Sequence, residues 1–187
     1  MIKLQPELLT HPTIPKALHG LNPRTLKGQA WWNKTRQEAY KSTDYHCLAC
    51  GVHKHSAKYH KWLEAHENYL YDYSTGRVEV QSIIPLCHSC HSFIHSQRLG
   101  MLLNIGQINY NKAFSIIQHG CNILSDNNLK GFNITIQFAE YLGCTNIPDS
   151  YVIDYSGVSW DKWHLILDGK SYTSNFKNEN EWANSFK

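Results

Sequence analysis

Four cysteines stand in two Cys-x-x-Cys pairs, Cys47-Leu-Ala-Cys50 and Cys87-His-Ser-Cys90. Each pair can present two thiolates from one tight turn to the same tetrahedral zinc ion. The usual pattern separates such pairs by roughly 15–20 residues, whereas 36 residues lie between Cys50 and Cys87 here, so a folded segment must fill the gap. The spacing predicts a closed structural zinc site. A redox pair and disulfides are the alternatives, and neither explains two pairs.

Three histidines near these cysteines could bind a second metal ion. His91 and His95 are four residues apart, which places them on one face of a helix, and His66 can add a third ring nitrogen from a strand. Three protein ligands leave positions open for water or a phosphate oxygen, as catalytic metal sites require. We therefore expect a second divalent ion, Mg²⁺, Mn²⁺ or Zn²⁺, at His66, His91 and His95. The alternative is ordinary surface or core histidines.

The elements that must position these side chains follow from periodicity and turn residues. Residues 62–67 and 78–84 have the composition of two strands joined through a turn at 74–76, and a helix over 88–98 follows. Outside this region the sequence predicts an extended arm over 1–20, helices over 30–41 and 111–124, strands over 151–155 and 163–172, and a short helix at 179–182. Residues 134–142 fit either a helix or a strand. Cys121 and Cys144 are expected to be small buried residues.

The segments Leu63-Glu-Ala-His66 and Pro85-Leu-Cys-His-Ser-Cys-His-Ser-Phe-Ile-His95, with their strand, strand, helix order, resemble the zinc-stapled subclass of the HNH endonucleases. The resemblance covers about residues 45–98. It implies an α+β fold, in which an HNH-like ββα-metal finger with a structural zinc spans 45–100. A basic N-terminal arm and helix over 1–44 and a C-terminal extension over 101–187, a helix plus a β-hairpin, would flank the finger.

The resemblance also implies roles for individual residues. His66 falls at the strand metal ligand of the family, and His91 and His95 fall at the helical ligands. Glu67 stands where the family has a general-base histidine, and Ser82 stands where it has an asparagine.

These two departures bear on catalysis. A carboxylate with a pKa near 4.3 is a weaker base than an imidazole, and a nearby cation lowers that pKa further. Two other routes to hydrolysis are open: His66 is itself the base, with Ala65 at the ligand position, or Glu67 or Asp72 orients a metal-bound water.

The charge distribution favours a nucleic-acid partner. Residues 1–61 carry a net charge of +7 and residues 62–187 a net charge of −4. Basic side chains that can contact phosphates are Arg24, Lys27, Lys34, Arg36, Lys54 and Lys58. Trp31 and Trp32 either stack on bases or pack inside the protein. Neither an apolar signal segment nor a membrane span is recognised, so we expect a cytoplasmic protein.

Together these patterns favour a metal-dependent HNH-like nuclease of a phage or bacterium that nicks or cleaves DNA, with a homodimer as one way to cut both strands. One alternative is a finger without hydrolytic activity that binds nucleic acid or protein through its zinc-stabilised scaffold. Another is an inhibitor or accessory of a defence system that docks on a host or phage protein through its C-terminal aromatic hairpin.

Overall fold

The computed structural model of the chain describes residues 2–186, which form two compact units. Unit 1 comprises residues 1–13, 39–66 and 84–153, and unit 2 comprises 14–38, 67–83 and 154–187. The units interleave along the chain, so this division differs from the three consecutive segments proposed from the sequence. Helices and strands are mixed, which confirms the α+β class.

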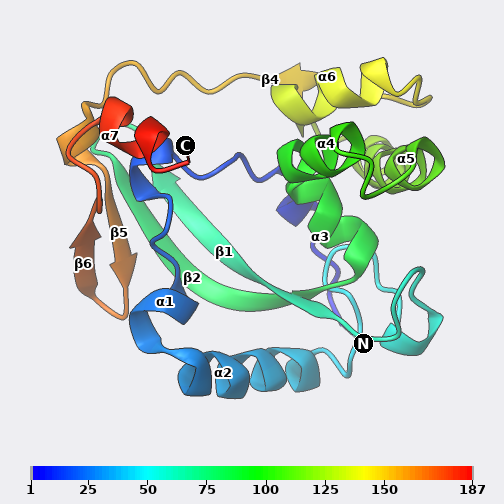
Figure 1. Cartoon of the computed structure of the whole chain (residues 1–187). Coiled ribbons are helices and arrows are strands. Elements are labelled where there is room, and N and C mark those ends of the chain that lie inside the picture. The colour runs from blue at the N-terminus through cyan, green and yellow to red at the C-terminus, as the bar shows by residue number, and fades with distance from the viewer. Residues whose placement is uncertain (1, 187) are drawn as a thin grey trace. The chain divides into compact units, whose positions relative to one another are not determined.

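Helices dominate unit 1 (Figure 1). They are α3 (His88–Ile94), α4 (Ser96–Asn104), α5 (Tyr110–Asp126) and α6 (Asn133–Tyr141), with the 3₁₀ helices η1 (Pro6–Thr10) and η3 (Lys54–Ser56). The Asn109 side chain caps α5 by accepting a hydrogen bond from the backbone N–H of Lys112 at 2.9 Å. The helix buries Ala113, Ile116, Ile117 and Leu124 at helical spacing. The predicted core helix over 111–124 is thus confirmed.

The ambiguous segment over 134–142 is helical. In α6 the side chains of Thr135, Ile136 and Ala139 are buried, which is the spacing of one helix face. Two short strands, β3 (Gly131–Phe132) and β4 (Ser150–Tyr151), pair in parallel beside it. The strand predicted over 151–155 is therefore confined to the start of that range.

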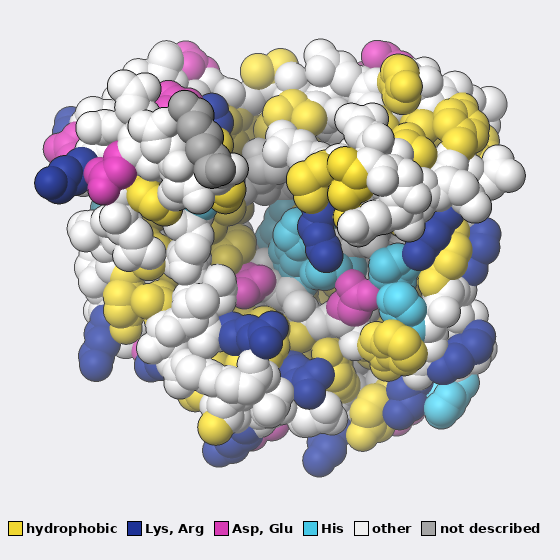
Figure 2. Space-filling model, in the orientation of Figure 1, with side chains coloured by type: hydrophobic (Ala, Val, Ile, Leu, Met, Phe, Trp, Pro, Cys, Tyr) yellow, Lys and Arg dark blue, Asp and Glu magenta, His cyan; other side chains and the backbone are white. Residues whose placement is uncertain are grey.

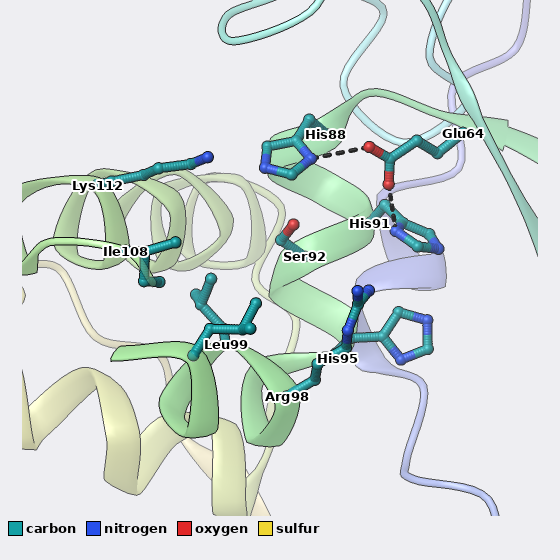
Figure 3. Close-up of a pocket in the computed structure, with 10 residues that line it drawn as sticks. Glu64, His88, His91, Ser92, His95, Arg98, Leu99, Ile108 and Lys112 are labelled. Atoms are coloured by element: carbon teal, nitrogen blue, oxygen red, sulfur yellow. Dashed lines mark hydrogen bonds and ion pairs between the residues drawn. The ribbon is translucent and has the colours of Figure 1, made fainter. Parts of the chain in front are cut away.

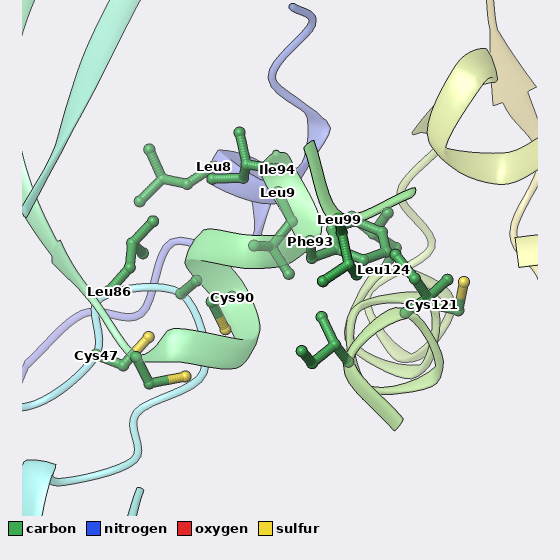
Figure 4. Close-up of a cluster of buried hydrophobic side chains, with 14 of the residues drawn as sticks. Leu8, Leu9, Cys47, Leu86, Cys90, Phe93, Ile94, Leu99, Cys121 and Leu124 are labelled. Carbon is green, nitrogen blue, oxygen red and sulfur yellow. The ribbon is translucent and has the colours of Figure 1, made fainter. Parts of the chain in front are cut away.

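One apolar core holds unit 1 together (Figure 4). Leu8 and Leu9 of η1 share it with Phe93 of α3 and Leu124 of α5. At Gly120 of α5 a Cβ atom would lie only 2.1 Å from the Phe93 ring. The missing side chain therefore lets the Phe93 ring lie directly against the backbone of α5.

The helix predicted over 88–98 is broken at His95, whose backbone angles are φ −90° and ψ 40°. Hydrogen bonding continues across the break, because His95 donates its N–H to the His91 carbonyl at 3.2 Å. The next residue, Ser96, is buried and its hydroxyl contacts that of Thr135 in α6 at 2.7 Å. This bond ties the start of α4 to α6, and α4 begins as a separate helix.

Unit 2 contains most of a four-stranded sheet in the order β1 (Glu64–Asp72), β2 (Arg77–Leu86), β5 (His164–Leu167) and β6 (Lys170–Thr173). β2 and β5 are parallel, and β5 and β6 are antiparallel. Asp168 and Gly169 have φ angles of 49° and 72°, as a type I′ hairpin turn requires. The predicted β1–β2 and β5–β6 hairpins are confirmed. Residues 64–66 and 84–86 belong to unit 1.

The rest of unit 2 packs on this sheet through Leu18, Val78, Trp163 and Leu165. Its other elements are α1 (Pro23–Lys27), α2 (Gln29–Ser42, of which 39–42 lie in unit 1), α7 (Glu179–Asn184), η2 (Lys16–Leu18) and η4 (Trp160–Lys162). The helices predicted over 30–41 and 179–182 are confirmed. None of the helices within residues 2–186 has the length and apolar character needed to cross a bilayer.

Candidate metal centres

The four cysteines of the two predicted pairs meet in unit 1. Their sulfur atoms all lie within 4.8 Å of one another, and the Cys50 and Cys87 sulfurs are 3.8 Å apart. A tetrahedron with Zn–S bonds of about 2.3 Å has edges of about 3.8 Å. Cys47, Cys87 and Cys90 are buried. The cluster can hold a metal such as zinc in a closed, structural geometry.

Local backbone bonds shape both turns. Gly51, with φ 77°, donates its N–H to the Cys47 carbonyl at 2.8 Å, and Cys87 precedes the first residue of α3. Leu48 donates its N–H to the carbonyl of Pro85 at 2.9 Å, which joins the two turns directly. The position of the four thiols is therefore fixed by the backbone rather than by the metal alone.

Hydrogen bonds among the thiols divide them into two kinds. These bonds lower the pKa of Cys47 and Cys87 and raise the pKa of Cys50 and Cys90. A bound zinc ion would replace the remaining protons, because only the thiolate is a metal ligand.

A histidine that sequence reasoning missed contacts this cluster. Nε2 of His119, from α5, lies 3.5 Å from the Cys90 sulfur. Of the histidines next to the pairs, His46 instead packs against the His53 ring, with ring centroids 4.9 Å apart. Only the packing of α5 on α3 brings His119 here, so no local spacing could have identified it.

The three histidines predicted for the second ion lie together in unit 1. Ring centroids are 5.4 Å apart for His66 and His91, 5.0 Å for His66 and His95, and 4.6 Å for His91 and His95. His66 comes from β1 and is buried, His91 comes from α3, and His95 lies at the break before α4. A fourth ring, that of His11, lies 6.2 Å from His66 and was also missed by the sequence reasoning.

Glu64 joins one of these rings, His91, to two further histidines, although no role was assigned to it from the sequence (Figure 3). One carboxylate oxygen accepts a hydrogen bond from Nδ1 of His91 at 2.5 Å. The other lies 2.8 Å from Nδ1 of His88 and 3.1 Å from Nε2 of His60. Glu64 precedes His66 by two residues, so both side chains project from the same face of β1. That alternation is the signal that could have identified Glu64.

The Glu64 carboxylate is held ionised. Burial by itself would raise its pKa, but hydrogen bonds from His88 and His91 outweigh burial and lower the pKa well below its ordinary value. A proton on Nδ1 of His91 is thereby fixed toward Glu64, which leaves Nε2 with a lone pair for a metal ion. Desolvation, helped by the charges of His91 and Arg98, lowers the pKa of His95 to about 4. His95 is thus neutral at pH 7, the form that binds metals.

A cavity of about 190 Å³ opens beside these rings. Its polar lining is Glu64, His88, His91, Ser92, His95, Arg98 and Lys112, and its apolar lining is Leu99, Leu102 and Ile108. Figure 2 shows histidine side chains gathered beneath α4, with Lys and Arg side chains beside them. Arg98 and Lys112 give the cavity two cations beside the single carboxylate of Glu64, a balance that suits an anionic ligand.

The other predicted catalytic residues belong to unit 2. Asp72 accepts hydrogen bonds from the hydroxyls of Ser74 at 2.6 Å and Thr75 at 2.7 Å, so it closes the β1–β2 turn. Glu67 lines a hollow of unit 2 with His19 and Tyr69. Ser82 is exposed on β2. Catalytic roles for these three residues stay predictions.

The predicted DNA-contacting side chains have partners within the protein. In unit 2, Lys27 pairs with Asp168 at 2.5 Å. Arg24 of α1 donates to Gln29 at the start of α2, and Arg36 and Lys34 contact neighbours within α2. In unit 1, Lys58 donates to Ser115 at 2.6 Å and Lys54 lies over the Tyr45 ring. A nucleic-acid interface at these residues stays a prediction.

No family model, curated protein or solved structure matches the chain. The likeness to HNH endonucleases therefore rests on the motifs of this sequence.

Proposed function

We propose that unit 1 is a metal-dependent phosphodiester hydrolase that acts on DNA in the manner of an HNH endonuclease. The proposal rests on one observation: the rings of His66, His91 and His95 lie together, with centroids 4.6–5.4 Å apart, beside a cavity lined by Arg98 and Lys112. Glu64 adds support, because it fixes the His91 ring in the tautomer that can bind a metal ion.

Three imidazoles would hold one divalent ion and leave coordination positions open. Such an ion would polarise a phosphoryl oxygen and lower the pKa of a bound water. The protein's own part is to orient the ligands. Glu64 sets the His91 ring, the backbone bond from His95 to His91 keeps their rings adjacent, and burial fixes His66.

Arg98 and Lys112 would bind the phosphate of the substrate. Both line the cavity beside His91 and His95, and basic side chains there offset the charge of a phosphodiester. Ser92, one residue after His91, adds a hydroxyl that can donate a hydrogen bond to a phosphate oxygen. Leu99 and Ile108 supply apolar side chains to the same lining.

The test is nicking of supercoiled plasmid by the purified full chain with Mg²⁺, Mn²⁺ or Zn²⁺. His91→Ala is expected to abolish nicking while elemental analysis still finds the zinc of the four cysteines. His55→Ala is the matched control, because His55 is exposed and contacts only His53 among the rings. Equal cleavage by the wild-type protein and His91→Ala would reject the assignment.

A second candidate is a nucleic-acid binding module without hydrolysis. It is favoured by Glu67 and Ser82, which stand where the family has a histidine and an asparagine. This candidate predicts salt-sensitive DNA binding in fluorescence anisotropy and no nicking with any of the three ions. Nicking gained by Glu67→His would support it, because that substitution restores the histidine that the family has at this position.

A further inference from the structure

His60, Glu64 and His88 bring three ligand atoms together at a second place in unit 1. This place is separate from the group formed by the His66, His91 and His95 rings. His60 lies in the loop after η3, Glu64 begins β1 and His88 begins α3. His60 Nε2 is 2.9 Å from His88 Nδ1 and 3.1 Å from Glu64 Oε1, and His88 Nδ1 is 2.8 Å from the same oxygen. The three atoms form a nearly equilateral triangle.

Hydrogen bonds alone do not account for the three short distances among these atoms. Glu64 Oε1 can accept from both rings, but the two N–H groups would then crowd onto one oxygen with their nitrogens only 2.9 Å apart and no hydrogen bond between them. If one nitrogen accepts from the other instead, it has no proton left for Glu64. Three linear hydrogen bonds cannot share the corners of one triangle, because each requires its hydrogen on the line between two atoms.

A divalent cation fits the same atoms. The circle through them has a radius of about 1.7 Å, less than the Zn–N distance of about 2.0–2.1 Å and the Zn–O distance of about 2.0–2.2 Å. An ion can therefore contact all three atoms from just outside their plane. Two histidines and one glutamate are also a ligand set that zinc uses in proteins.

The surroundings hold these ligands in place. The His60 ring stacks on Trp62 with centroids 4.3 Å apart and planes 3° apart. The Tyr59 ring meets the His88 ring edge-on at 5.4 Å. The second oxygen of Glu64 is bound to His91. The side chains of all three ligands are less than a quarter exposed.

We propose that His60, Glu64 and His88 form a third metal site, suited to zinc, distinct from both the four-cysteine cluster and the three-histidine group. Glu64 then serves two sites, since one of its oxygens binds this ion while the other holds the His91 ring. The proposal does not rest on hydrolytic activity.

Trp62 provides a direct readout, because it stacks on a ligand ring and is the only tryptophan in unit 1. The full chain, with its cysteine-bound zinc retained, is titrated with Co²⁺, a paramagnetic probe that quenches nearby fluorescence. A His95→Ala background weakens the three-histidine group. In the His95→Ala protein, Co²⁺ is expected to quench the part of the fluorescence that comes from Trp62. Adding His55→Ala should leave this quenching unchanged, and adding Trp62→Phe should remove it.

Adding His60→Ala is expected to lower the Co²⁺ affinity measured from Trp62 quenching by more than about 100-fold. Loss of a hydrogen bond that only supports a ligand lowers metal affinity by about 10–100-fold. His60→Asn, which keeps a polar side chain, should lower the Co²⁺ affinity in the same way. The content of cysteine-bound zinc and the melting temperature show whether each variant is folded. Unchanged quenching in both folded variants would overturn the proposal. Quenching in a protein that never nicks DNA would support this site while rejecting the proposed function.

Discussion

The carboxylate of Glu64 and the imidazole of His91 are joined by a hydrogen bond of 2.5 Å that links β1 to α3. Glu64 also lies on the same face of β1 as His66. One strand thus supplies both a candidate ligand and the group that orients another candidate ligand. This arrangement makes Glu64 a positioning residue for the three-histidine group.

Glu64→Gln should lower metal affinity at His66, His91 and His95 by about 10–100-fold, because the neutral amide is a weaker acceptor for the His91 proton. Calorimetric titration with Mn²⁺ or Zn²⁺ measures this effect. Glu64→Gln and the protein with which it is compared should both carry His60→Ala, which removes the neighbouring site proposed at His60, Glu64 and His88. Glu140→Gln, at an exposed position of α6, is the control, and equal affinities for Glu64→Gln and this control would refute the role of Glu64.

The four-cysteine cluster should be essential for the stability of unit 1. Cys90→Ala removes a fully buried ligand and is expected to cost about 4 kcal/mol or more in free energy of unfolding, as losses of structural metals do. Elemental analysis and thermal unfolding measure the two effects. Cys144→Ala, at a buried cysteine outside the cluster, should keep one equivalent of cysteine-bound zinc. Full zinc content in Cys90→Ala would contradict the assignment.

Gly120 and Gly100 should respond oppositely to alanine. Gly120→Ala gains helix propensity of about 1 kcal/mol, but its Cβ would overlap the Phe93 ring, and overpacking costs about 1–3 kcal/mol. In α4, a Cβ at Gly100 would lie 3.7 Å from Phe138, an ordinary contact. Chemical denaturation should therefore show a loss of stability for Gly120→Ala and no loss for Gly100→Ala. A gain for both would mean that Phe93 moves aside freely.

The hydrogen bonds of Asp72 should stabilise unit 2 at neutral pH and lose this effect in acid. Hydrogen bonds from Ser74 and Thr75 lower the pKa of Asp72 to about 2, compared with about 3.9 in an unfolded chain. Because the folded pKa is the lower one, this stabilisation is present above pH 3.9 and is lost as pH falls toward 2. Carbon-13 NMR of the carboxyl group measures the pKa. Asp72→Asn should remove this acid dependence without changing plasmid nicking, and a loss of nicking would instead support a catalytic role for Asp72.

Features encoded within a few neighbouring residues could be predicted from the sequence, whereas contacts between distant segments could not. The Cys-x-x-Cys turns, the Asp168-Gly169 hairpin and the apolar face of α5 are each encoded within a few residues, and each is found as predicted. His119 and His11 reach their neighbours through packing between distant segments, which spacing does not reveal. The residue after the helix break at His95, Ser96, likewise contacts Thr135, 39 residues away.

Residues 6–10 pack in the same core as α5, through Leu8 and Leu9. All four thiols of the cysteine cluster have been synthesised by residue 90, yet the apolar surface that receives Leu8 and Leu9 is not complete until residue 126 has left the ribosome. Contacts so far apart in the chain form late and slow folding. If the cluster takes up zinc, the ion can bind the growing chain before η1 packs into the core, and a chain that lacks residues 6–10 is expected to keep the metal site while exposing the core.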